Sequence, residues 1–213
     1  MIMVRDNELE GLLPTIDEST MRALHARLAE SAERDGLLDV AYRTVDSPVG
    51  ELLLAATERG LVRVAYLRAG VGAGAGLVAG EDAILAQLAA EISPRVLAAP
   101  GRLDPVAHEL DEYFTGRRTS FDLPLDFQLA RGFRREVIQR LPDIAYGATA
   151  SYAQVAASAG SPRAVRAVGT ACALNPLPIV LPCHRVVRSD GGMGRYAGGP
   201  EAKVALLHLE ATR

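Results

Sequence analysis

The chain has 213 residues, of which 49% are hydrophobic and 23% charged. This length fits one large domain or two small ones, and the composition is that of a globular protein, which excludes wholesale disorder. Two cysteines exclude a disulfide-rich scaffold, and both would stay reduced in a cytosol. The apolar stretches are far shorter than the roughly 20 residues of a membrane helix. The charged N-terminus contains no apolar signal-peptide core, so we expect a cytoplasmic protein without a membrane partner.

The net charge of −3 conceals two halves of opposite sign. Residues 1–116 contain ten arginines and 19 acidic residues, which gives −9, whereas residues 117–213 contain 13 basic and seven acidic residues, which gives +6. A basic half is typical of proteins that bind a polyanion. The two halves can instead neutralise each other across an internal interface. The change of sign places the expected domain boundary near residues 116–130.

Apolar periodicity predicts helices and strands in the first half of the chain. Residues 17–34 have a helical repeat whose apolar stripe consists of Met21, Leu24, Leu28 and Ala32. Alternating apolar runs predict an antiparallel meander of strands at residues 40–45, 51–56 and 61–66. Residues 69–80 are rich in Gly and Ala and predict a loop, which lacks the lysine of a phosphate-binding loop. Two helices and a last strand are expected at residues 81–93, 104–115 and 119–123.

Helices predominate in the second half. Residues 151–159 predict a short helix that ends at Gly160. Ser161 is expected to cap a second helix that has Pro162 in its first position. Two short helices joined by a glycine-containing turn are the outline of a helix-turn-helix. Flanking helices are expected at residues 131–141 and from Pro200 onward.

The second helix of this pair has two different faces. At about 100° per residue, its apolar face consists of Val165, Val168 and Cys172. The opposite face carries Arg163, Arg166 and Thr170. The small residues Ala167, Gly169 and Ala171 would let the helix backbone approach a partner closely, and the arginines would then neutralise phosphates. An ordinary helical hairpin with solvated arginines is the alternative.

The most specific pattern of the chain precedes and includes Cys183. It begins with three prolines, Pro176, Pro178 and Pro182. Their rings restrict the backbone that leads to Cys183. His184 and Arg185 follow directly, and a neighbouring base or cation favours the reactive thiolate of a cysteine.

Three other interpretations fit these residues alone. Cys183 could be a buried small hydrophobe, which is the commonest role of a free cysteine. It could bind a metal together with His184, although two cysteines and four scattered histidines form no recognisable zinc pattern. It could also be the nucleophile of a thiol hydrolase.

The context of the cysteine is more specific than these alternatives. Pro182-Cys183-His184-Arg185-Val186-Val187 resembles the active-site motif of the O6-alkylguanine-DNA alkyltransferases, also called methylated-DNA–protein-cysteine methyltransferases. Further segments similar to this family are Tyr113-Phe114-x-Gly116, Leu123-Pro124-Leu125, Ile144-x-Tyr146-Gly147-x-Thr149-x-Ser151-Tyr152, Arg166-Ala167-Val168-Gly169, Gly194-x-Tyr196-x-Gly198-Gly199 and Leu206-Leu207-x-x-Glu210. The resemblance covers residues 40–213 and is strongest over residues 144–210.

The resemblance implies an α/β (α+β) fold of two domains. Residues 39–120 would form a small ribonuclease-H-like domain with an antiparallel sheet. Residues 121–213 would form a helical, winged-helix-like domain that contains the helix-turn-helix and the catalytic residues. Residues 1–38 would be an extension of unknown role. The family repairs DNA by moving the alkyl group of O6-alkylguanine, and also of O4-alkylthymine, onto its own cysteine once per molecule, so no cofactor is expected.

The family's catalytic residues correspond to five positions of this chain. Cys183 would accept the alkyl group, and His184, oriented by Glu210, would take the thiol proton through an ordered water. A thiol with a pKa of about 8.5 is mostly protonated at neutral pH, so this relay would ionise it at the moment of attack. Tyr152 would donate its phenol hydrogen to the departing guanine oxygen. Asn175 would hold the turn before the active site.

The resemblance also implies how DNA is bound. A base inside a duplex must be flipped out before it can react, and Arg166 would fill the gap that it leaves. The second helix would lie in the minor groove of double-stranded DNA that contains the alkylated base. The expected DNA-binding residues are Arg163, Arg166, Ala167, Gly169, Thr170, Ala171 and Arg185. The expected base pocket consists of Tyr152, Val186, Tyr196 and Ala197.

The chain also departs from the family. A hydroxyl residue is common where Ala197 stands, and this change would alter which alkyl groups fit. The zinc ligands of some relatives are missing, so we expect no metal, and we expect a monomer in which Cys172 is inert packing. The alternatives are a non-repairing sensor of alkylated bases, against which Cys183, His184 and Glu210 argue, and a methylation-responsive regulator, which would need a second DNA-binding domain.

Overall fold

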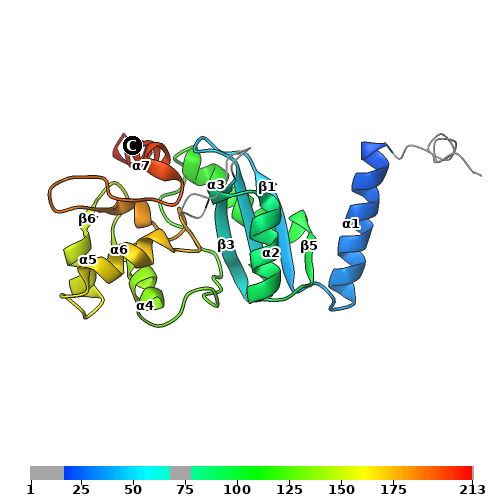
Figure 1. Cartoon of the computed structure of the whole chain (residues 1–213). Helices are drawn as coiled ribbons and strands as arrows, with labels where there is room; N and C mark the ends of the chain where they lie inside the picture. Colours follow the sequence, from blue (N-terminus) through cyan, green and yellow to red (C-terminus); the bar gives the residue numbers. More distant parts are fainter. Residues whose placement is uncertain (1–16, 68–77, 213) are drawn as a thin grey trace, which may run out of the picture.

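A five-stranded sheet forms the centre of the computed structural model, which describes residues 17–67 and 78–212 (Figure 1). The strands are β1 Val40–Val45, β2 Leu52–Thr57, β3 Gly60–Leu67, β4 Val78–Ala79 and β5 Val96–Ala98, in the order β4-β3-β2-β1-β5. β1, β2 and β3 pair antiparallel, which confirms the predicted meander. β5 and β4 join its two edges in parallel.

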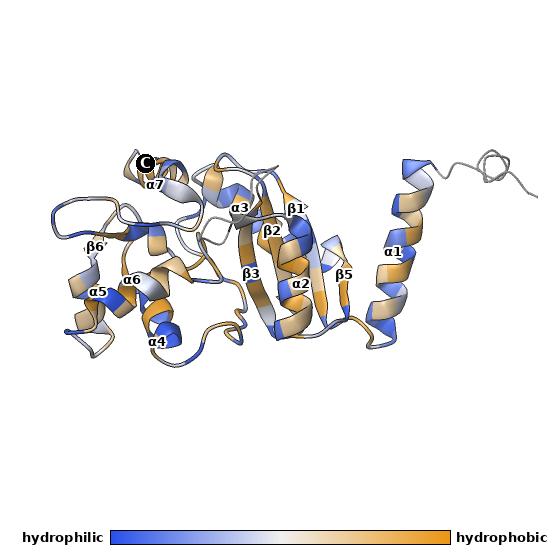
Figure 2. Ribbon diagram, in the orientation of Figure 1, coloured by the Kyte–Doolittle hydropathy of each residue, from blue (hydrophilic) through white to orange (hydrophobic). Residues whose placement is uncertain are grey.

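Both faces of this sheet are buried. On one face, Leu52 and Leu54 pack with α3, Asp104–Phe114, and with the second half of the chain. On the other face, Leu53 packs beneath α2, Glu81–Glu91. Alternate residues of β2 therefore belong to different cores, and this explains why the strand is apolar from Leu52 to Ala56 and does not alternate with polar residues (Figure 2).

The helix predicted near the N-terminus is confirmed as α1, Glu18–Arg34. Asp17 caps it by accepting a 2.7 Å hydrogen bond from Thr20 N. The helix lies at the edge of the sheet beside β5 (Figure 1), and Ala29 is its buried residue. Of its apolar stripe, Ala32 packs against a small cluster formed by Ala29, Leu38, Ala41 and Ala99, but the other three residues do not join a core of the described residues. Exposed on the stripe are Met21, Leu24 and Leu28, at 40%, 45% and 53%.

The described second half contains four α-helices and a two-stranded parallel sheet. The helices are α4 Phe133–Arg140, α5 Tyr152–Ser158, α6 Val165–Ala173 and α7 Gly199–Ala211, and the strands are β6 Ala150–Ser151 and β7 Val186–Val187. The two-stranded sheet packs against α5. Short 3-10 helices occur at η1 Pro100–Leu103, η2 Leu141–Asp143 and η3 Cys183–Arg185. A capping box formed by Ser151 and Gln154 starts α5.

Within residues 17–67 and 78–212, no helix is long and apolar enough to cross a membrane.

The strand predicted at residues 119–123 is not formed, and this segment has no regular secondary structure. Just after it, Pro124 O accepts a 2.8 Å hydrogen bond from Leu61 N on β3, and Leu125 forms an isolated parallel bridge with Leu61. Pro124 has no N–H to donate, so pairing with the sheet stops at this single bridge.

The second helix of the helix-turn-helix begins three residues later than predicted, at Val165. Ser161 does not cap it. Instead Ala164 N donates to Ser161 O over 2.8 Å, and this hydrogen bond closes a turn that contains Pro162. Of the loop predicted at residues 69–80, residues 69–77 lie outside the described part of the chain, and Val78–Ala79 form β4.

The packing of Pro124 on β3 predicts the effect of enlarging Gly60. This glycine has a φ of +130°, and a Cβ added to it would overlap the backbone carbonyl of Pro124. We expect Gly60→Ala to lower the free energy of unfolding by about 1–3 kcal/mol, measured by urea denaturation. Gly50→Ala is the matched control, because Gly50 has a φ of +108° but nothing lies within 4 Å of its Cβ position. Equal losses in the two variants would show that backbone strain alone, and not contact with Pro124, requires glycine at position 60.

Candidate active site

Cys183 follows a tightly constrained segment. The fully buried Asn175 donates from Nδ2 to Leu181 O over 2.9 Å and accepts at Oδ1 from Leu177 N over 3.0 Å. Ile179 has a φ of +74°, a left-handed conformation that a β-branched residue rarely adopts. Asn175 therefore closes the turn on both sides and delivers Cys183 to the first position of η3.

The Cys183 thiol is buried, with 2% of the residue exposed. Burial raises the pKa of Cys183 to about 11, although the Asn175 side chain and the charge of Lys203 act in the opposite direction. At neutral pH the thiol is therefore protonated and weakly nucleophilic at rest. A base must remove its proton when a reaction takes place.

His184, the residue after Cys183, is a buried neutral base. Its Nε2 lies 2.9 Å from Glu210 Oε1. Burial lowers the pKa of His184, although its hydrogen bond to Glu210 acts to raise it. When the proton of the neutral His184 ring is on Nε2, this nitrogen donates to the Glu210 carboxylate. Nδ1 then has no proton and can accept one. Nδ1 is buried and has no hydrogen-bond partner among the described residues.

Glu210 on α7 is the meeting point of this network. Its carboxylate accepts from Tyr113 OH over 2.7 Å, from Arg185 Nε and Nη2 over 2.9 Å each, and from Gly147 N over 3.2 Å. Burial acts to raise the pKa of Glu210, but the hydrogen bonds from His184, Arg185 and Tyr113 outweigh it and hold the pKa at about 2. Glu210 thus stays ionised and fixes the orientation of the imidazole.

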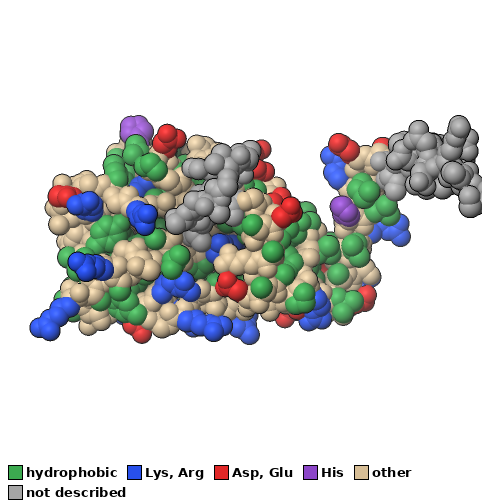
Figure 3. Space-filling view, viewed as in Figure 1, with side chains coloured by type: hydrophobic (Ala, Val, Ile, Leu, Met, Phe, Trp, Pro, Cys, Tyr) green, Lys and Arg blue, Asp and Glu red, His purple; other side chains and the backbone are tan. Residues whose placement is uncertain are grey.

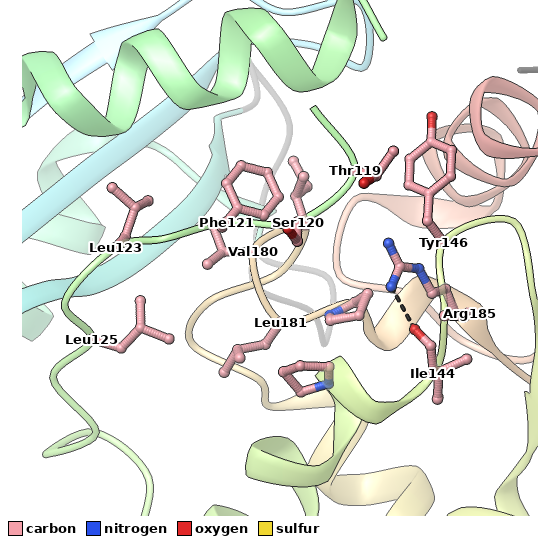
Figure 4. A pocket seen from close by; sticks show the side chains of 14 residues that line it. Thr119, Ser120, Phe121, Leu123, Leu125, Ile144, Tyr146, Val180, Leu181 and Arg185 are labelled. Carbon is pink, nitrogen blue, oxygen red and sulfur yellow. Dashed lines mark hydrogen bonds between the residues drawn. The ribbon is translucent and has the colours of Figure 1, made fainter. Parts of the chain in front are cut away.

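Arg185 occupies this network and not the expected DNA interface. Its Nη1 donates to Ile144 O over 2.6 Å, and the residue is 6% exposed. Figure 4 shows this bond at the wall of a pocket whose lining residues come from 119–125, 142–146 and 179–185. A buried guanidinium committed to Glu210 and Ile144 is not free to reach a DNA phosphate, so the predicted DNA contact of Arg185 is wrong.

Sequence reasoning missed the roles of Tyr113 and Lys203. In the sequence Tyr113 only begins a segment that is similar to the family, whereas in the structure its hydroxyl donates to Glu210. The fully buried Lys203 donates from Nζ to Val186 O over 2.6 Å and to Met193 O, and burial lowers the pKa of Lys203. The available signal was the helical spacing that puts Lys203 and Glu210 on the buried side of α7.

Tyr152, the first residue of α5, meets the loop that precedes α7. A Cβ on Gly194 would overlap the Tyr152 hydroxyl, and one on Gly169 of α6 would lie 4.0 Å from its ring. Burial raises the pKa of Tyr152 to about 12, so its hydroxyl stays protonated and can donate. Tyr152 is half-buried, whereas the other expected pocket residues, Val186, Tyr196 and Ala197, are buried.

α6 and the turn before it present a basic face to solvent. Exposed on it are Arg163, Arg166, Ala167 and Thr170. Val168 and Cys172 are buried as predicted, whereas Val165 is 37% exposed. Ala171 was expected at the DNA but is 2% exposed, because it lies three residues after Val168 and shares its inward side. Figure 3 shows more Lys and Arg than acidic side chains over this half of the visible face.

Two family models match the chain. "6-O-methylguanine DNA methyltransferase, ribonuclease-like domain" matches residues 40–127, and "6-O-methylguanine DNA methyltransferase, DNA binding domain" matches residues 132–212. The chain belongs to the 6-O-methylguanine DNA methyltransferase family. The resemblance based on the segment around Cys183 is thereby confirmed.

Members of the 6-O-methylguanine DNA methyltransferase family align with most of this chain. The methylated-DNA–protein-cysteine methyltransferase of Methanosarcina barkeri is 37% identical over 169 residues, which are 79% of this chain and 96% of the relative. The crystal structure of Mycobacterium tuberculosis O6-methylguanine methyltransferase has a TM-score of 0.66 at 36% identity and covers 82% of this chain and 94% of that one. The M. tuberculosis OGT in complex with DNA has a TM-score of 0.65 at 35% identity, with coverages of 81% and 93%. These matches confirm the expected α/β fold, with the sheet first and the helical part second.

The Glu210 network predicts how the stability of this family member depends on pH. The pKa of Glu210 is about 2 in the folded protein, against an ordinary value of 4.5. A lowered carboxyl pKa stabilises the fold above pH 4.5, and that stabilisation is lost as the pH falls toward the folded value. We expect the free energy of unfolding to fall by a few kcal/mol between pH 4.5 and 2, measured by urea titration.

Glu210→Gln should lack this part of the acid dependence and should be less stable at pH 7, because the buried Arg185 loses its anion. His208→Gln on the exposed side of the same helix is the control and should keep the wild-type profile. An unchanged acid dependence in Glu210→Gln would assign the effect to other carboxylates.

Proposed function

We propose that this protein repairs DNA by transferring the alkyl group of O6-alkylguanine to Cys183, with O4-alkylthymine as a second substrate. The observation that carries this proposal is the neutral, buried His184 ring that directly follows the buried Cys183 in the chain. One of its nitrogens is held by ionised Glu210, and the other is open to accept a proton. The relatives are named for methyl transfer from DNA to a cysteine, and this geometry supplies the proton acceptor that such a step needs.

In the proposed reaction, Cys183 Sγ bonds the alkyl carbon as the bond from that carbon to guanine O6 breaks. The thiol proton moves through a bridging water to His184 Nδ1, and Glu210 stabilises the imidazolium that forms. Tyr152 donates a hydrogen bond to the departing oxygen, and its pKa of about 12 suits a donor that keeps its proton. The guanine leaves as an anion and takes up a proton from solvent, and the His184 imidazolium later returns its proton to solvent. The thiol therefore loses one proton and the guanine product gains one, and the step balances without a cofactor.

The thioether formed on Cys183 ends the activity of the molecule, because nothing in this scheme breaks the carbon–sulfur bond. A non-repairing sensor of alkylated bases needs no proton acceptor beside a thiol. The arrangement of Cys183, His184 and Glu210 therefore favours repair over the sensor or regulator alternative.

We further propose that α6 lies in the minor groove of duplex DNA with the alkylated nucleotide flipped out. The exposed arginines and small residues of its outer face support close approach to phosphates. Arg166 would occupy the gap in the base stack. A cytoplasmic monomer, and a division of the chain into residues 39–120 and 121–213, belong to the same proposal.

Alkylation of Cys183 can be measured directly. After incubation with a duplex that contains O6-methylguanine, we expect the intact mass to increase by one methyl group on the peptide that contains Cys183. Cys172→Ser should be modified at the wild-type rate, since Cys172 packs on the buried side of α6. Repeated turnover by one molecule, or undiminished transfer in Cys183→Ser, would refute the proposed reaction.

Arg166 provides a test of base flipping that is separate from the chemistry. Arg166→Ala should react with free O6-benzylguanine almost as fast as the wild type does, because a free base needs no flipping. Its reaction with methylated duplex DNA should slow markedly, because filling the gap offsets an unstacking cost of a few kcal/mol. The measurement is the rate of Cys183 alkylation on each substrate at two salt concentrations.

Arg163→Ala is the matched control, because it removes one charge from the same exposed surface. Equal slowing of the duplex reaction in both variants would mean that Arg166 only contacts a phosphate and does not fill the gap in the base stack.

A further inference from the structure

The N-terminal sheet reaches the active site through the side chain of Tyr66 on β3. Tyr66 OH and Tyr196 OH lie 3.0 Å apart and form a buried hydrogen bond between residues 130 positions apart in the chain. The two rings meet edge to face, with centroids 5.9 Å apart. Tyr66 is 4% and Tyr196 9% exposed, so neither hydroxyl has ready access to water as a substitute partner.

Tyr196 is held between this sheet and the catalytic residues. The His184 ring also meets the Tyr196 ring edge to face, with centroids 6.1 Å apart. Tyr66 also presses on the backbone that follows Tyr196, because a Cβ added to Gly198 would lie 2.5 Å from Tyr66 Cζ. Tyr66 itself is paired with Leu52 of β2 and with Val78 of β4 in a sheet that is buried on both faces, and this packing restrains it.

We infer that Tyr66 is a positioning residue that sets the width of the base pocket and thereby the size of the alkyl group that Cys183 accepts. This inference rests on the proposed function. Tyr196 and Ala197 form the expected wall of that pocket, and alanine contributes little bulk to it. The position of the wall therefore depends on the contacts of Tyr66 with Tyr196 and Gly198.

The test uses Tyr66→Phe in the full-length chain, a change that removes the hydroxyl and keeps the ring on Gly198. Two duplexes of identical sequence carry either O6-methylguanine or O6-benzylguanine, and the rate of Cys183 alkylation is measured with each. We expect the ratio of the benzyl rate to the methyl rate to rise about two- to tenfold, because loss of one hydrogen bond lets Tyr196 move aside for the larger group. Both rates come from one preparation, so a smaller folded fraction leaves the ratio unchanged.

Two further variants identify the hydroxyl pair as the cause. Tyr196→Phe should raise the ratio by the same factor, and the double variant should raise it no further, because each change removes the same hydrogen bond. Tyr42→Phe is the matched control, since Tyr42 belongs to the same sheet but its hydroxyl interacts with Glu81. Its ratio should equal that of the wild type.

An unchanged or lower ratio in Tyr66→Phe, or additive changes in the double variant, overturns the positioning role. Absence of any alkylation of wild-type Cys183 by either duplex overturns the proposed function instead. The two failures are therefore distinct.

Discussion

The buried carboxylate of Glu210 is the interaction on which the catalytic centre depends. It accepts hydrogen bonds from the side chains of Tyr113, His184 and Arg185 and from the backbone of Gly147. An anion inside a protein is tolerated only when donors replace its hydration. These donors come from α3, from η3 and from the segment before β6. The hydrogen bonds that stabilise the buried charge therefore also hold these three segments together at the site.

The surroundings of Cys183 keep its thiol protonated, and therefore unreactive, until a base accepts the proton. Burial raises the pKa of Cys183 and lowers that of His184, so both are neutral at pH 7. Glu210 and Arg185 form an internal ion pair, and the buried Lys203 leaves one positive charge near the sulfur. That charge favours a thiolate as it forms without keeping the resting thiol ionised.

β3 contacts the chain segments on both sides of Cys183. The sheet thus contributes to the site by supporting these segments, although it carries no catalytic side chain. Contacts to the second half recur along this strand, from Leu61 to Pro124, from Val64 to Pro176 and from Tyr66 to Tyr196. A strand buried on both faces and paired with neighbouring strands is a rigid base. Displacement of the segments around Cys183 would therefore have to break several hydrogen bonds together.

The sequence by itself determined the elements and the reacting group. The antiparallel meander, the cap of α5 at Ser151 and the constrained approach to Cys183 depend on residues close together in the chain, so periodicity, capping and proline spacing reveal them. The prediction of a strand at residues 119–123 was wrong. The alternation of apolar and polar residues in a segment does not say which other strand it would pair with. Only the tertiary structure decided that Arg185 binds Glu210 instead of DNA, that Ala171 faces the core, and that Tyr113 and Lys203 belong to the site. Each of these depends on contacts between residues distant in the chain, and it is folding that determines which donor meets which acceptor.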